Sequence, residues 1–203
     1  MNDSRAGEEL KVIRQLMERP IRFSTMSGLS GILAGCAALA GVAAGRLVSE
    51  RFDPDTAAWI NLGLWAGVFA VAFLCAVVLT RLRERGRDMP FWSSVKRRIL
   101  LTILPPFVAG AGLTAAIAFR WHLGVEPNQW GLIPAVWMLF YGVALWQVGA
   151  FSVPDVRVLG AAFLVAGLIC GGFSQAWPYC SLGITFGGFH VAYGIIVWLR
   201  HGG

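Results

Sequence analysis

Charged residues are scarce in this 203-residue sequence, at 14% of the chain, whereas a soluble domain has about a quarter. Lysine is almost absent, and neither Lys11 nor Lys96 lies in a long uncharged stretch. No lysine is therefore available inside a membrane to form a Schiff base with a retinal-type chromophore. Hydrophobic residues make up 57% of the chain and glycine contributes 25 residues. This composition is typical of a polytopic membrane protein.

Motifs for common catalytic chemistry are also missing. The sequence has no glycine-rich phosphate loop, no HExxH zinc motif and no paired carboxylates. No acidic residue lies inside a predicted membrane helix, which removes the usual relay for protons or sodium ions. The four cysteines lack the spacing of a metal site and are predicted to be small packing residues. The sequence therefore favours neither an enzyme nor a metal site.

Uncharged segments recur along the chain, and each is long enough to cross a bilayer, which takes about 20 helical residues. The last of them, residues 158–199, is of double length and is divided by the turn-prone residues 175–178. The sequence predicts an all-α polytopic membrane protein, a six-transmembrane-helix bundle built from three helical hairpins. Within a membrane domain of residues 23–200 the expected spans are 24–45, 57–80, 99–119, 130–150, 157–175 and 181–199.

Basic residues are distributed unevenly between the two sides of the predicted bundle. Residues 1–22, predicted to form a short amphipathic helix, and the loop 81–98 account for most of the 14 Lys and Arg on one side, against three on the other. The positive-inside rule then places both termini in the cytoplasm. The loop 81–98 is expected to attract anionic lipid headgroups. Direct binding to nucleic acid is not expected, because no nucleic-acid-binding module is present.

Glycines at helical spacing predict where the spans pack together. Gly31 and Gly35 form such a pair in the first span, and similar pairs lie at positions 41/45, 63/67 and 167/171. In the last span Gly183, Gly187 and Gly194 are expected to lie on one face together with a histidine. Lipid gives helices no hydrophobic reason to associate, so close approach of backbones at small residues matters more than in water.

That histidine, His190, is the strongest candidate for a functional residue. It lies in the middle of the last span, where an uncharged imidazole still needs hydrogen-bond partners. Tyr193, Tyr141 and Gln147 are the residues expected to share a ligand-binding site with it. Three interpretations stay open, namely a structural hydrogen bond between helices, a ligand or sensing site, and an axial ligand of haem. The other two histidines lie too near the ends of the predicted spans to supply a second haem ligand at the same depth.

Four stretches, residues 17–35, 141–145, 158–160 and 186–194, resemble a family of bacterial six-helix membrane proteins that has no assigned function. The resemblance covers most of the chain. It implies a multi-pass protein of the bacterial cytoplasmic (inner) membrane. It implies no catalytic residue and no cofactor.

Two classes of function follow from these observations. A regulatory or sensory protein would bind a small apolar ligand or a cytoplasmic partner, either alone or as a homo-oligomer. A small-solute transporter or channel would instead need a continuous polar path through the bundle. The predicted spans offer few polar residues for such a path, so the sequence favours the regulatory or sensory protein. A haem-binding or other redox protein that depends on His190 is the second alternative.

Overall fold

The computed structural model describes residues 28–85, 93–125, 129–150, 152–173 and 178–201, and the predicted N-terminal helix of residues 1–22 lies outside them. The described residues form helices and no β-strand. In chain order the elements are α2 (Gly28–Arg51), α3 (Pro54–Arg85), α4 (Ser94–His122), the 3-10 helix η1 (Trp130–Leu132), α5 (Ile133–Val148), α6 (Pro154–Phe173), α7 (Pro178–Leu182), the π-helix η3 (Gly183–Phe189) and α8 (His190–His201).

Six helical stretches have the length and hydropathy needed to cross a membrane, which confirms the predicted all-α polytopic class. They are Gly28–Arg51, Pro54–Arg85, Lys96–His122, Trp130–Val148, Pro154–Phe173 and Pro178–Arg200. The last stretch joins α7, η3 and α8 without a break. Several helices are longer than the uncharged segments from which they were predicted, because polar and charged residues continue a helix beyond the apolar part.

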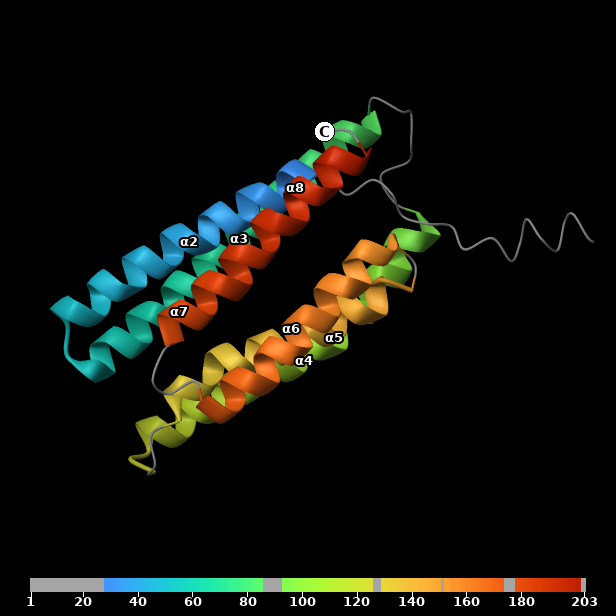
Figure 1. The fold of residues 1–203 in the computed structure, drawn as a ribbon. Helices are drawn as coiled ribbons and strands as arrows, with labels where there is room; N and C mark the ends of the chain where they lie inside the picture. Colours follow the sequence, from blue (N-terminus) through green and yellow to red (C-terminus); the bar gives the residue numbers. More distant parts are fainter. Residues whose placement is uncertain (1–27, 86–92, 126–128, 151, 174–177, 202–203) are drawn as a thin grey trace, which may run out of the picture.

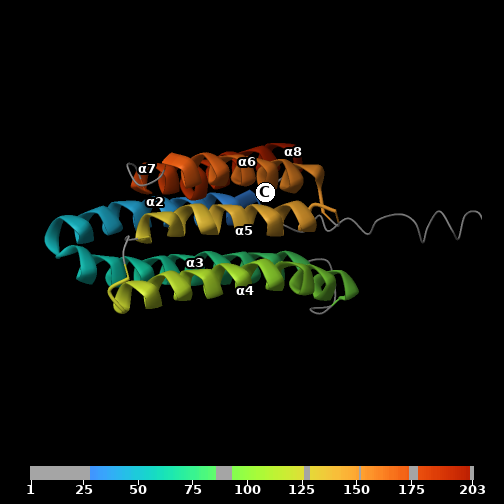
Figure 2. The ribbon, with the colours of Figure 1, turned by 90° about the horizontal axis from the view of Figure 1, so that it is seen from below.

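The long helices stand in two layers that face each other (Figures 1 and 2). The first layer has α2 in its centre, between α3 and the continuous helix α7–η3–α8. The second layer has α5 in its centre, between α4 and α6. This arrangement corrects the prediction of three hairpins in one respect. The fifth and sixth spans do not form a closely packed pair, because α6 packs on α5 while η3 and α8 pack on α2.

Glycines explain how closely the helices approach inside each layer. A methyl group added to Gly31 of α2 would lie only 3.0 Å from the Cα atom of Gly194 in α8. In the second layer, a methyl group on Gly160 of α6 would lie 3.0 Å from the carbonyl oxygen of Gly142 in α5. These distances leave no room for a side chain, so the helix backbones are in direct contact.

The other predicted packing glycines differ in how tightly they are enclosed. A methyl group on Gly35 would lie 2.7 Å from the carbonyl oxygen of Gly187, whereas one on Gly183 would be 3.9 Å from the nearest side-chain carbon. The pair Gly63 and Gly67 in α3 does not pack, because a methyl group on either would meet no described atom within 4 Å. The most apolar part of α3 contains no buried residue. This helix therefore leaves much of its surface for the bilayer.

The two ends of the bundle differ in composition. We call one the basic end: α3 and α8 finish there, α4 and α6 begin there, and in Figure 1 it lies beside the C terminus. It carries Arg81, Arg83, Arg85, Arg97, Arg98, Arg157 and Arg200. We call the other the tryptophan end, where α2 connects to α3 and α4 finishes. It carries Trp59, Trp121 and Trp130.

Candidate functional site between the helix layers

His190 follows directly after the π-helix η3. A π-helix is wider than an α-helix, and short π-helical turns are frequently found at functional sites. Two sets of contacts meet at this point of the helix. Gly187 and Gly194 face α2, while the imidazole ring of His190 lies against Tyr141 of α5 and Phe163 of α6. The prediction that the histidine and the glycines share one face of a regular helix is therefore wrong.

The imidazole is linked to the opposite layer by a hydrogen bond. The hydroxyl oxygen of Tyr141 and Nε2 of His190 are 2.7 Å apart, and the tautomer of the ring decides which atom donates. The histidine is buried, with 9% of its surface exposed. Its Nδ1 atom is buried as well and makes no regular hydrogen bond with a described residue.

Aromatic rings surround this hydrogen bond. Phe163, which is fully buried, meets the imidazole edge-to-face with the ring centroids 5.4 Å apart, and meets the ring of Tyr141 at 4.9 Å. Phe186 lies nearly parallel to the imidazole, at 6.2 Å. Well-oriented aromatic pairs contribute about 0.5–1.5 kcal/mol beyond the burial of their area. The described rings form a filled aromatic core around the imidazole.

The structure brings together most of the residues predicted for this site. Tyr141 and His190 are bonded, and Tyr193 belongs to the same buried core, although its hydroxyl group makes no hydrogen bond with a described residue. Gln147 lies elsewhere. It is exposed and stands six positions after Tyr141 in α5, which turns its side chain to another side of the helix.

This environment does not fit a haem group. Nε2 of His190 faces the hydroxyl of Tyr141, and Phe163 and Phe186 occupy the space beside the ring. An axial ligand needs a free nitrogen that points to open space large enough for the macrocycle. Among the described residues, no group of three or more His, Cys, Asp or Glu side chains could hold a metal ion.

Ion pairs connect the layers at the basic end. Lys96 of α4 binds the carboxylate of Glu84 in α3, whose side chain is only 1% exposed. On the other side of the bundle, Arg200 of α8 donates to Asp155 of α6 over 2.8 Å. Sequence analysis missed the first pair because it ended the second span at residue 80. The helix continues to Arg85, so an acidic residue does lie inside a helix, in its last turn.

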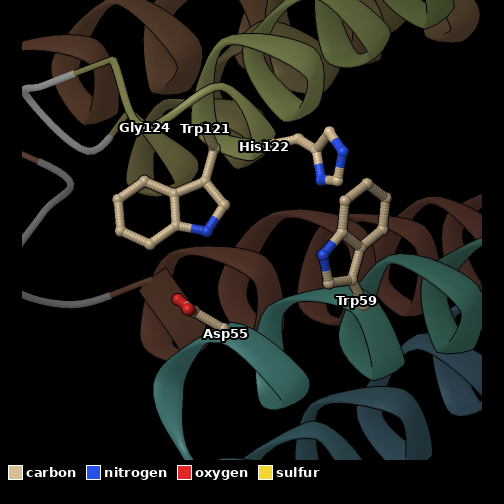
Figure 3. Close-up of a pocket in the computed structure, with 5 residues that line it drawn as sticks. All are labelled: Asp55, Trp59, Trp121, His122 and Gly124. Atoms are coloured by element: carbon tan, nitrogen blue, oxygen red, sulfur yellow. The ribbon is translucent and has the colours of Figure 1, made fainter.

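A pocket of about 290 Å³ lies between the layers at the tryptophan end (Figure 3). Asp55 and Trp59 of α3 line one side, and Trp121, His122 and Gly124, at the end of α4, line the other. His122 was weighed from the sequence only as a haem ligand. The remaining four residues were assigned no role, because nothing in the sequence shows that the start of α3 faces the end of α4.

Comparisons with known proteins do not identify either site. No protein-family model matches the chain. No curated protein and no solved structure matches it either. The resemblance to a bacterial membrane protein family therefore stays a prediction.

Proposed function

We propose that this chain is a regulatory or sensory membrane protein, in which the position of one helix layer relative to the other is the signal. The observation that carries this proposal is the difference between two kinds of contact. One helix pair inside each layer, α2 with α8 and α5 with α6, has backbones in contact at glycines, but the layers meet through side chains. A side-chain interface can repack between two discrete arrangements, so the layers are the units that move.

A cytoplasmic partner is the recipient of the signal in this proposal. The basic end faces the cytoplasm, since 14 of the 17 Lys and Arg residues fall on its side of the predicted topology. Both Glu84–Lys96 and Asp155–Arg200 bridge the layers at this end. A shift of one layer changes how these charges are paired, and so changes the electrostatic surface that a soluble partner contacts.

The ligand that fits this proposal best is a small apolar molecule from the bilayer. Helices α3 and α4, which belong to different layers, meet in the apolar region through Phe69 and Phe107, whose ring centroids are 5.4 Å apart. Phe69 is 47% exposed, so this contact is accessible from the lipid side. An apolar molecule inserted between these rings would push the layers apart.

A transporter or channel is less well supported. Such a protein needs polar groups along a continuous path. At the level of Tyr141 and His190 the described part of the bundle is filled by Phe163, Phe186 and Phe189, with the hydrogen-bonded pair as the local polar contact.

Spin-label distances test the proposed movement. In a chain whose four cysteines are replaced by alanine, labels at Leu82→Cys and Leu101→Cys would report across the layers, from exposed positions on α3 and α4. Labels at Leu101→Cys and Val165→Cys, on α4 and α6, would form the control pair within one layer. We expect Lys96→Met to shift or broaden the first distance distribution and to leave the second unchanged.

Two results would contradict the proposal. One is that both distance distributions respond equally to Lys96→Met, which would mean that the layers do not move as units. The other is saturable flux of a small solute into proteoliposomes that contain the purified protein, which would favour the transporter.

A further inference from the structure

The pocket at the tryptophan end combines two features that recognise organic cations. Its lining includes the indole rings of Trp59 and Trp121, which come from opposite layers, and the carboxylate of Asp55 (Figure 3). The face of an indole ring attracts a cation through its quadrupole, and indole is the best of the aromatic side chains for this purpose. A carboxylate beside such rings supplies the compensating charge.

Asp55 is available for a ligand, whereas its neighbour Asp53 is not. The carboxylate of Asp53 accepts a hydrogen bond from the backbone N–H of Thr56 over 3.0 Å, which caps the start of α3 and lowers the pKa of Asp53. The side chain of Asp55 forms no ion pair or hydrogen bond with any residue that the structure describes. Its side chain lines the pocket instead.

The positions of the aromatic rings are fixed by local structure. Trp59 packs edge-to-face against Trp130, with ring centroids 5.4 Å apart. On the other side, α4 ends at His122 and is followed by Gly124, which has a φ of 70°. Gly124 donates to the carbonyl oxygen of Trp121, and Val125 to that of Arg120, as in a Schellman motif. This turn stops the helix directly after Trp121 and His122.

We infer that this pocket binds an organic ammonium group, held against the indole rings of Trp59 and Trp121 and paired with Asp55. Tryptophan is common at membrane interfaces as an anchor, but anchoring does not require two indoles from different layers to line one pocket with an unpaired carboxylate. The volume of about 290 Å³ is at the lower limit of ligand pockets, which suits a headgroup-sized cation. Asp55 and His122 are too few to hold a metal ion.

The ammonium group has two chemical sources. It belongs either to a soluble amine on the outer side of the membrane or to the headgroup of a zwitterionic phospholipid such as phosphatidylethanolamine. Both present the same charge to the same residues. This inference does not depend on the proposed signalling function, because binding can be measured on its own.

Calorimetric titration of the full chain in an uncharged detergent tests the inference. The probes are tetramethylammonium and choline, with 3,3-dimethylbutan-1-ol as the uncharged analogue of choline. We expect saturable binding of the cations and weaker or no binding of the alcohol. Asp55→Asn and Trp59→Leu should each weaken cation binding by about five- to tenfold. The matched controls, Asp53→Asn and Trp198→Leu, make the same changes outside the pocket and should bind as the unmodified chain does.

Native mass spectrometry of protein released from nanodiscs distinguishes the two sources. Retention of phosphatidylethanolamine over phosphatidylglycerol, lost in Asp55→Asn, would assign the site to a lipid headgroup. Binding of choline without such retention would assign it to a soluble amine. The inference would be overturned if neither ligand bound, if the uncharged alcohol bound as well as choline, or if Asp55→Asn behaved like Asp53→Asn.

Discussion

Inside the layers, α2 meets α8 at Gly31 and Gly194, and α5 meets α6 at Gly160, with no space for a side chain at these points. Between the layers, the central contact is instead the hydrogen bond between the hydroxyl of Tyr141 and the ring of His190, enclosed by other aromatic rings. Both kinds of contact hold helices together without help from the hydrophobic effect. The first depends on shape alone and tolerates little change, whereas the second depends on a few side chains that can rearrange.

The largest effect is expected at the buried ion pair between the layers. Lys96→Met leaves the carboxylate of Glu84 buried without its partner, which typically costs about 3–5 kcal/mol. Unfolding of the purified protein in mixed detergent micelles would measure the loss. Combining Lys96→Met with Glu84→Leu should recover most of it. Arg200→Met serves as the control, because the pair Asp155–Arg200 is more exposed and should contribute at most about 1 kcal/mol. Equal losses for Lys96→Met and Arg200→Met would contradict this difference.

An intermediate effect is expected inside the layers. Gly160→Leu places a side chain against the backbone of α5, and overpacking of this kind costs about 1–3 kcal/mol. Gly63→Leu makes the same change on α3, where the added carbon meets no described atom within 4 Å, and should leave stability unchanged. Thermal unfolding in detergent would compare the two variants. If Gly160→Leu were also neutral, the backbone contact would not be what holds α5 and α6 together.

The smallest effect is expected at the hydrogen bond between the layers. Tyr141→Phe removes the hydroxyl and keeps the ring, so it should lose only the bond to His190, about 0.5–2 kcal/mol. Tyr193→Phe removes a buried hydroxyl that makes no hydrogen bond with a described residue, and should change stability less. The same thermal assay measures both. A greater loss from Tyr193→Phe would mean that the wrong tyrosine has been assigned to the interface.

Sequence patterns predicted the fold class and the number of spans, because long uncharged segments are the dominant signal in a membrane protein. They did not predict which helices share a layer. The spacing of Gly63 and Gly67 is the same as that of Gly31 and Gly35, yet only the second pair faces another backbone. Spacing along one helix shows that close packing is possible but does not identify the neighbour.

The candidate sites were predictable only where a residue stood out by itself. A histidine in the middle of an apolar span is conspicuous, and so His190 and its hydrogen-bond partner Tyr141 were singled out. Glu84 was not, because charged residues were used to mark where spans end. The pocket formed by Asp55, Trp59 and Trp121 was also missed, since it depends on contact between helices that are distant in sequence.

The π-helix η3 changes the directions in which the side chains of the last transmembrane helix point around its axis. A π-helical turn accommodates one residue more than an α-helical turn, and one residue corresponds to a rotation of about 100°. Compared with a regular α-helix, the residues after η3 are therefore rotated around the helix axis with respect to the residues before it. Within α8, His190 and Gly194 are four residues apart and differ by about 40° in direction, so the imidazole reaches Tyr141 of the other layer while Gly194 lies against α2. If η3 were to rewind as a regular α-helix, α8 would rotate against α7, and the imidazole would turn away from the tyrosine without any change in the length of the chain.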